Sequence, residues 1–289
     1  YPNRISWLVS SLILLFAQSL LAASVAPIAA KHGMVVSAQH LATRVGVDVL
    51  KQGGNGVDAA IAVAYALAVV YPAAGNLGGG GFMTLHLADG RQTFIDFRER
   101  APLAATTDMF LDSTGNVIPE LRTRSHKAVA VPGTVAGLEL ARQRYGSLPR
   151  AQLIAPAIKL AEQGFLLDEG DVLMLQEASA DLARDPASAA IFLEGGKALQ
   201  VGAQLRQKDL AKTLRAISKN GVAGFYQGPV AKALVAASQA GGGILSQADL
   251  KTYTALEREP VRCNYHGYQI IAAPPPSSRD RPCRGRRRP

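Results

Sequence analysis

The sequence has 289 residues, of which 48% are hydrophobic and 18% are charged. This apolar content excludes an intrinsically disordered chain, and the glycines and prolines follow no fixed period that would indicate collagen. Two cysteines are too few for a disulfide-stapled scaffold. The formal net charge is +9, but six arginines lie within residues 279–288. The basic character therefore belongs mainly to the tail and does not indicate a nucleic-acid-binding domain.

Residues 1–23 have the pattern of a secretory signal peptide. Arg4 precedes an apolar run over residues 7–16, and small residues follow this run to an expected cleavage point after Ala23. The alternative is an uncleaved membrane anchor, which the two serines within the run disfavour. We therefore expect export, with a periplasmic or secreted location, and a mature domain over residues 24–278.

The start of the mature domain predicts a short strand and two helices. Residues 34–37 are expected to form a buried strand. Residues 38–52 have apolar side chains at helical spacing, and the pair Gly53-Gly54 is a typical helix end. Residues 57–70 are apolar on nearly every side, so this second helix should be buried on most faces, with Pro72 ending it.

The next segment combines a glycine run with a predicted β-hairpin. Residues 75–81 contain four consecutive glycines, which allow close backbone approach. Two strand-like segments, 82–88 and 91–97, flank Asp89-Gly90 and predict a hairpin with a type I′ turn. The order helix, glycines, strand differs from a dinucleotide-binding fingerprint, and the Gly-Lys-Ser/Thr of a P-loop is absent. We therefore expect no nucleotide cofactor.

The remaining mature sequence is mostly helical, with strands at its end. Thr134 is the expected N-cap of a helix that reaches Tyr145. Two late strands are expected on either side of His266-Gly267. Strands near both ends with helices between them indicate one mixed α+β domain. The further helical segments are expected over residues 149–163, 168–184, 207–219 and 229–239, with a short capping signal at Ser246.

No metal site or self-contained nucleophile is expected. The five histidines are scattered, no Cys-x-x-Cys or His-x-x-x-His occurs, and known hydrolase nucleophile motifs are absent. The most notable charged cluster is Asp96-Phe97-Arg98-Glu99-Arg100. The Arg98 guanidinium could clamp a carboxylate through two parallel hydrogen bonds, or it could form a structural ion pair with Asp96 or Glu99. The residues alone leave both interpretations open.

The arginine-rich tail, residues 279–289, is expected to be disordered because it contains almost nothing that could be buried. A basic arm for nucleic acid or anionic lipid is one interpretation. The preferred interpretation is a shifted reading frame, since six arginines without a lysine suggest codon bias rather than a selected patch.

Five motifs in this order resemble the large-chain part of γ-glutamyltranspeptidases, and the resemblance covers residues 32–278. The motifs are Gly53-Gly-Asn-Gly-Val-Asp-Ala-Ala60, Gly75-Asn-Leu-Gly-Gly-Gly-Gly-Phe-Met83, Ile95-Asp-Phe-Arg-Glu99 with Ala101-Pro102, Pro132-Gly-Thr-Val-Ala-Gly137 and Pro274-Pro-Pro-Ser-Ser278.

The resemblance implies an N-terminal-nucleophile hydrolase fold, an αββα sandwich, built from a precursor that cleaves itself into large and small chains. It implies that a threonine at the new N-terminus of the small chain attacks the γ-glutamyl amide of substrates such as glutathione. The acyl group then passes to water or to an amino acid or peptide. For this sequence it implies one substrate-binding residue, Arg98, for the α-carboxylate of the γ-glutamyl group, and no cofactor or metal.

The resemblance ends after Ser278, where the family continues with glycines, further large-chain sequence and then the small chain. We therefore expect an incomplete sandwich, no catalytic residue in this chain, and a precursor fragment that is inactive without a small chain. The alternatives are a related glutaryl-type acylase of the same fold and a non-catalytic pairing fragment. No stable membrane span and no nucleic-acid partner are expected.

Overall fold

The structure is a computed structural model and describes residues 28–277. The expected signal peptide, residues 1–23, and the expected arginine-rich tail, residues 279–289, lie outside the described residues. The chain divides into two units, residues 1–34 and residues 35–289. In the first unit, residues 28–34 form no helix or strand.

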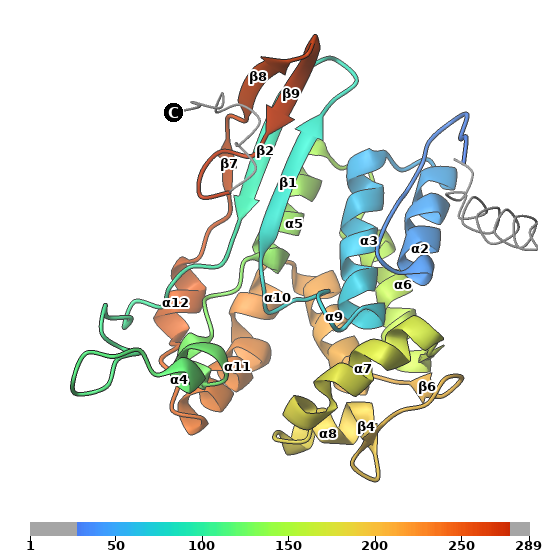
Figure 1. Cartoon of the computed structure of the whole chain (residues 1–289). Coiled ribbons are helices and arrows are strands. Elements are labelled where there is room, and N and C mark those ends of the chain that lie inside the picture. The colour runs from blue at the N-terminus through green and yellow to red at the C-terminus, as the bar shows by residue number, and fades with distance from the viewer. Residues whose placement is uncertain (1–27, 278–289) are drawn as a thin grey trace, which may run out of the picture. The chain divides into compact units, whose positions relative to one another are not determined.

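Helices make up most of the described part of the second unit (Figure 1). Most follow the sequence expectation to within a few residues, and their ends carry side-chain caps or glycines. The helices are α2 (His40–Lys51), α3 (Gly56–Val70), α4 (Pro119–Thr123), the 3₁₀ turn η2 (His126–Ala128), α5 (Thr134–Tyr145), α6 (Arg150–Gln163), α7 (Glu169–Leu182), α8 (Pro186–Phe192), α9 (Lys208–Asn220), α10 (Ala223–Tyr226), α11 (Gly228–Ala240) and α12 (Gln247–Thr252).

The main sheet among the described residues is antiparallel and has the order β1-β2-β7. The expected hairpin supplies β1 (Gly81–His86) and β2 (Gln92–Phe97). The third strand, β7 (Leu256–Arg258), comes from the far end of the domain and was not predicted. A separate hairpin joins β8 (Val261–Tyr265) to β9 (Tyr268–Ala272). Short two-residue strands form two further pairs, β3 (Phe165–Leu166) with β6 (Gln204–Leu205) and β4 (Leu193–Glu194) with β5 (Lys197–Ala198).

The core lies around α3 and the inner face of the sheet. Helix α3 packs against α2 and α6, and most of its side chains are buried, as its apolar sequence predicted. On the sheet side, Ile95 and Phe97 of β2 are buried with Val135 and Leu138 of α5 in the same cluster. The end of β2 is thereby packed against the start of α5. This packing fixes the position of the residues that follow Phe97.

Two local expectations are wrong. Residues 34–37 form no strand, and Met34 and Val36 are 55% and 82% exposed, because no neighbouring strand pairs with this segment. The β1–β2 connection is not a type I′ turn, which requires positive φ at both Asp89 and Gly90. Only Gly90 has positive φ there. The Leu87 N–H donates to the Arg91 carbonyl and closes a wider loop over residues 88–90, within which the Gly90 N–H donates to the Leu87 carbonyl.

The two-residue turn with positive φ at both positions occurs in the other hairpin. Tyr265 pairs directly with Tyr268, while His266 and Gly267 have φ values of 48° and 83°. This is the type I′ geometry, and among the described non-glycine residues only His266 has positive φ. The left-handed backbone conformation that the sequence predicted for Asp89 in β1–β2 is therefore found at His266 in β8–β9.

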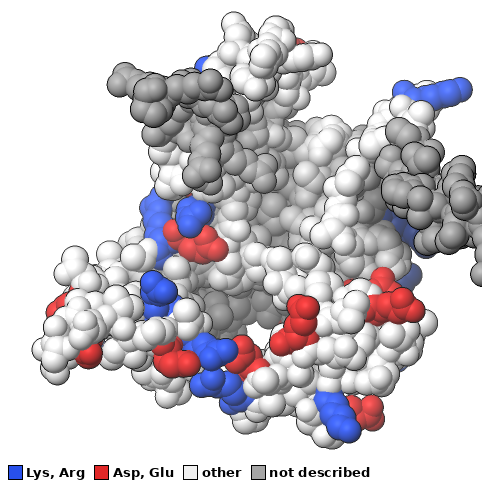
Figure 2. All heavy atoms as spheres, in the orientation of Figure 1, with Lys and Arg blue, Asp and Glu red and all other residues white. Residues whose placement is uncertain are grey.

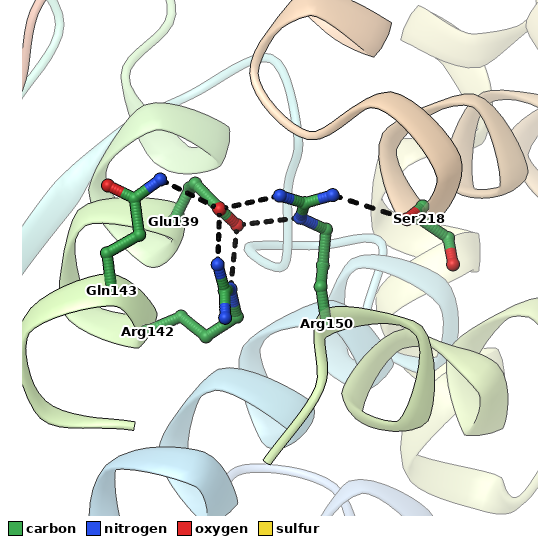
Figure 3. Close-up of polar contacts among 5 residues, drawn as sticks. All are labelled: Glu139, Arg142, Gln143, Arg150 and Ser218. Atoms are coloured by element: carbon green, nitrogen blue, oxygen red, sulfur yellow. Dashed lines mark hydrogen bonds and ion pairs between the residues drawn. The ribbon is translucent and has the colours of Figure 1, made fainter. Parts of the chain in front are cut away.

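Helix α5 also carries a buried charged group, Glu139, which is 4% exposed (Figure 3). Its carboxylate accepts two hydrogen bonds from Arg142, two from Arg150 and one from Gln143, at 2.8–3.1 Å. Burial raises the pKa of Glu139, but the hydrogen bonds from the two arginines outweigh it and lower the pKa to about 2. Arg150 also reaches the carbonyl of Ser218, so the cluster joins α5, α6 and α9.

Gly137 allows α5 to approach β2, and we expect Gly137→Ala to destabilise the chain. A Cβ at this position would overlap the Phe97 ring. The overpacking should cost about 1–3 kcal/mol, measured by urea unfolding followed by circular dichroism. Gly56→Ala, at the start of α3 where a Cβ meets nothing, is the matched control and should be neutral or slightly stabilising. Equal stability of the two variants would contradict this account of the packing.

Within residues 28–277, no helix combines the length and the apolar character that crossing a bilayer requires.

Candidate functional site

Arg98 lies immediately after β2, at the point where the sheet meets the start of α5. Its backbone N–H donates to Asp96 Oδ1 at 3.1 Å, and its guanidinium carbon lies 5.9 Å from the centroid of the Phe82 ring. Within the described part of the chain, the Arg98 side chain makes no hydrogen bond or ion pair. An exposed guanidinium with unused N–H donors on a held backbone is suited to binding an anion from solution.

The charged cluster around Arg98 therefore does not pair within itself. Asp96 forms its ion pair with Arg258 of β7, at 3.1 Å, and Arg258 also donates to the carbonyl of Pro275 at 2.8 Å. Glu99 has no ion pair among residues 28–277. Of the two interpretations that the sequence left open, the internal ion pair with Asp96 or Glu99 is not formed.

The glycine run packs against the backbone on both sides of Arg98. A Cβ at Gly80 would meet the Phe97 carbonyl oxygen and the Glu99 nitrogen, and a Cβ at Gly133 would overlap the same Phe97 oxygen. The Gly79 carbonyl accepts hydrogen bonds from the backbone N–H of Gly133, at 2.7 Å, and of Thr134. These glycines allow close approach between backbone segments.

Thr134 is the first residue of α5 and not its cap, which is Gly133. The Thr134 hydroxyl instead lies 2.6 Å from Asn76 Oδ1, and that oxygen also accepts from the Gly79 N–H at 3.0 Å. The hydroxyl thus donates to Asn76 in the glycine-rich segment 75–81. This bond stabilises the loop that packs against Phe97 and Glu99, on either side of Arg98. The helix was predicted correctly from the sequence, but the prediction that Thr134 is its N-cap is wrong.

Two buried tyrosines complete the support of the Arg98 backbone, and the sequence contained no signal for either. The Tyr253 hydroxyl donates to the Arg98 carbonyl at 2.8 Å. Its ring stacks on Tyr226, with centroids 5.8 Å apart, and the Tyr226 hydroxyl donates to the Pro132 carbonyl at 2.8 Å. Burial raises the pKa of Tyr253 to about 12, so its hydroxyl stays protonated and able to donate near neutral pH.

Arg98 opens onto a cavity of about 560 Å³. Figure 2 shows basic and acidic side chains gathered on this face, below the sheet. The charged lining consists of three cations and one carboxylate, so an anion is favoured. The lining residues are Gly78, Arg98, Glu99, Arg100, Ala101, Pro102, Ala105, Met109, Phe110, Lys127, Ala128, Val129 and Ala130.

The first of the five sequence motifs, residues 53–60, has a structural role away from this cavity. Asn55 caps α3, and the fully buried Asp58 accepts hydrogen bonds from Ser147 and from the Leu148 backbone. Burial raises the pKa of Asp58, but these hydrogen bonds outweigh it, and the pKa is lowered. Asp58 therefore fastens α3 to the connection between α5 and α6. Among the described residues, no group of three or more His, Cys, Asp or Glu could hold a metal ion.

Comparison with known proteins decides the family. The sequence profile of the family described as Gamma-glutamyltranspeptidase matches residues 42–280. The chain belongs to this family.

Two curated relatives and one solved structure show the extent of the similarity. The γ-glutamyltranspeptidase-family chain is 60% identical over 258 residues to the glutathione hydrolase proenzyme of Pseudomonas sp. strain A14, covering 89% of this chain and 45% of that precursor. It is 42% identical over 258 residues to the acylase ACY 1 proenzyme of Pseudomonas sp. strain V22, covering 87% and 46%. Helicobacter pylori γ-glutamyltranspeptidase matches with a TM-score of 0.85 at 46% identity, covering 88% of this chain and 73% of that one.

The γ-glutamyltranspeptidase-family chain thus spans about half the length of the curated relatives it matches, and it corresponds to the large-chain part of their precursor. The resemblance drawn from the five motifs is confirmed. The structural similarity also confirms the expected fold class, an α+β N-terminal-nucleophile hydrolase fold.

Proposed function

We propose that this chain is the large-chain part of a γ-glutamyl hydrolase and transferase, in which Arg98 binds the α-carboxylate of the γ-glutamyl group. The observation that supports this is the Arg98 guanidinium, which lines a cavity without an ion pair among the described residues while its backbone is held by Tyr253 and Asp96. A planar guanidinium matches a carboxylate through two parallel hydrogen bonds. The chain's own contribution is to bind and orient the substrate.

The bond-breaking step is assigned to a small chain of the same precursor. Its N-terminal threonine hydroxyl attacks the γ-glutamyl carbonyl of a substrate such as glutathione, and the free α-amine of that threonine takes the hydroxyl proton. The amine of the leaving group departs with a proton and leaves an ester between the threonine and the γ-glutamyl group. Water or the amine of an amino acid or peptide then cleaves this ester.

The test is to mix the purified chain with a separately produced small chain from the Pseudomonas sp. strain A14 relative and to follow p-nitroaniline release from γ-glutamyl-p-nitroanilide. We expect hydrolysis by the mixture and none by either chain alone. Hydrolysis by the 289-residue chain alone would contradict the assignment of the nucleophile to the small chain. A stable complex without hydrolysis would indicate a non-catalytic pairing role instead.

Tyr253 is expected to act as a positioning residue for Arg98. Tyr253→Phe removes the hydrogen bond to the Arg98 carbonyl and should weaken binding of γ-glutamyl ligands about threefold to tenfold, measured by isothermal titration calorimetry. Binding of the corresponding 4-aminobutanoyl ligand, which lacks the α-carboxylate, should change less. Tyr268→Phe, at a tyrosine that is 73% exposed, is the matched control. An equal loss for both ligands would show a general structural effect.

A second candidate function is hydrolysis of glutaryl amides, which the similarity to the acylase ACY 1 proenzyme favours. A glutaryl group keeps the carboxylate that Arg98 would bind but lacks the α-ammonium group. Arg98 therefore fits both acyl groups. Comparing γ-glutamyl-p-nitroanilide with glutaryl-p-nitroanilide as substrates of the mixed chains distinguishes them, and we expect kcat/KM to be higher for the γ-glutamyl compound.

We further propose that the protein is exported, to the periplasm or the medium. The support is the sequence pattern of residues 1–23, with Arg4, the apolar run and the small residues before Ser24. N-terminal sequencing of protein recovered from the periplasm should begin at Ser24. Recovery of uncleaved protein from the membrane fraction would favour the anchor interpretation.

A further inference from the structure

The cavity beside Arg98 holds more positive charge than one carboxylate requires. Arg98, Arg100 and Lys127 line it together with Glu99. Among residues 28–277, none of the four makes an ion pair. The γ-glutamyl group is a zwitterion, with one carboxylate and one ammonium group, so Arg98 and Glu99 already match its charge. The positive charges of Arg100 and Lys127 have no counterpart on the γ-glutamyl group.

Arg100 is held in place beside the cavity. Its backbone exchanges hydrogen bonds with Val131, at 3.2 and 2.8 Å. Its guanidinium lies 5.3 Å from the centroid of the Tyr253 ring, and one nitrogen donates to the Thr254 carbonyl at 3.1 Å. The remaining N–H donors have no partner in the described part of the chain. A guanidinium fixed in this way loses little conformational entropy when it binds an anion.

Lys127 comes from a different part of the chain, the 3₁₀ turn η2, which contacts α11. The residue is half-buried, and its ammonium group has no hydrogen bond among residues 28–277. Because the segment after β2 and the segment 127–130 both line the cavity, Arg100 and Lys127 contribute positive charge to it from two separate segments.

The shared cavity relates this charge to Arg98, because Arg98, Arg100 and Lys127 line the same space of about 560 Å³. A cavity of this size has room for a small ligand with two anionic groups. In a dipeptide such as γ-glutamylglycine, the glutamyl side chain and one amide bond separate the α-carboxylate from the free carboxylate on the leaving-group side. An anion held by Arg100 and Lys127 beside a carboxylate held by Arg98 therefore corresponds to that second carboxylate.

We propose that Arg100 and Lys127 form a second carboxylate subsite, which binds the free carboxylate on the leaving-group side of γ-glutamyl peptides. This inference rests on the proposed function, because it takes the α-carboxylate to be at Arg98. It predicts a substrate class: γ-glutamyl peptides that end in a free carboxylate are preferred over uncharged γ-glutamyl amides.

The test is equilibrium binding of two ligands to the purified 289-residue chain by isothermal titration calorimetry at fixed ionic strength. γ-Glutamylglycine and γ-glutamylglycinamide differ only in whether the second group is a carboxylate or a neutral amide. We expect γ-glutamylglycine to bind about threefold to tenfold more tightly. Arg100→Met and Lys127→Met should each lower this affinity ratio, and the double variant should bring it close to one.

Lys251→Met is the matched control, because Lys251 is an exposed cation of α12 that does not line the cavity. A ratio of one in the wild-type chain, an unchanged ratio in Arg100→Met and Lys127→Met, or an equal fall of the ratio in Lys251→Met would overturn the subsite while leaving Arg98 untouched. Failure of both ligands to bind, or binding that Arg98→Met does not weaken, would instead overturn the proposed function, and the subsite with it. Circular dichroism of each variant shows that the fold is kept.

Discussion

Arg98→Lys is expected to raise KM for γ-glutamyl-p-nitroanilide about tenfold to a hundredfold in the enzyme assembled from this chain and a small chain. Lysine keeps the positive charge but loses the planar pair of N–H donors that can bind both carboxylate oxygens. Because the α-carboxylate is bound equally in the ground state and the transition state, kcat should change little. Steady-state kinetics of p-nitroaniline release measure both constants.

The control for this prediction is a substrate without the α-carboxylate. For 4-aminobutanoyl-p-nitroanilide, Arg98→Lys and the wild-type enzyme should have similar kcat/KM, since there is no carboxylate to lose. The exposed side chain of Arg98 is not needed for packing, so the variant should fold normally. An unchanged KM for the γ-glutamyl substrate would rule out Arg98 as the carboxylate clamp.

Glu139→Gln is expected to reduce the free energy of unfolding by about 3 kcal/mol. The substitution leaves Arg142 and Arg150, whose side chains are only 23% and 25% exposed, without their shared carboxylate. Removing one member of a buried charge cluster is costly because the remaining charges stay desolvated. Urea unfolding measures the difference. Glu162→Gln breaks an exposed pair with Arg215 and, as the matched control, should change stability by less than about 1 kcal/mol.

Glu139 also predicts a pH dependence. Its pKa is lowered from 4.5 to about 2 in the folded chain, so the folded state binds this proton less readily than the unfolded state. The stabilisation is therefore complete above about pH 4.5 and is lost as the pH falls from there towards about 2. The stability difference between wild type and Glu139→Gln, measured by urea unfolding at several pH values, should shrink over this range. A difference that stays constant would contradict the lowered pKa.

The local structure could largely be predicted from the sequence. Ser246 caps α12, where its capping signal was predicted, and α6, α7 and α9 lie within a few residues of their expected ranges. These predictions succeed because caps and helix ends depend on residues only a few positions apart. The predicted type of the turn between β1 and β2 was wrong because Asp-Gly occurs in more than one kind of hairpin loop, and the residues alone do not distinguish these loops.

Of the residues at the candidate site, only Arg98 was named from the sequence. The residues that surround it were not predicted. The resemblance assigned Arg98 to the α-carboxylate, while the nearby Asp96 and Glu99 offered ion-pair partners of equal plausibility. The structure shows Asp96 paired with Arg258 of β7, a strand that was not predicted. Nothing in the spacing of residues indicated that Arg258, so distant in sequence, would pair with Asp96 and leave the Arg98 guanidinium without that partner.

By itself the sequence determined most of the long helices and the two hairpins β1–β2 and β8–β9, that the long apolar helix α3 is buried, and which family's motifs are present, because these follow from short-range patterns. Only the tertiary structure decided that β7 joins β2, that Tyr253 holds the Arg98 carbonyl, and that Arg100 and Lys127 line one cavity with Arg98. These contacts connect residues that are far apart along the chain. Their formation depends on how the whole core packs, which no local pattern encodes.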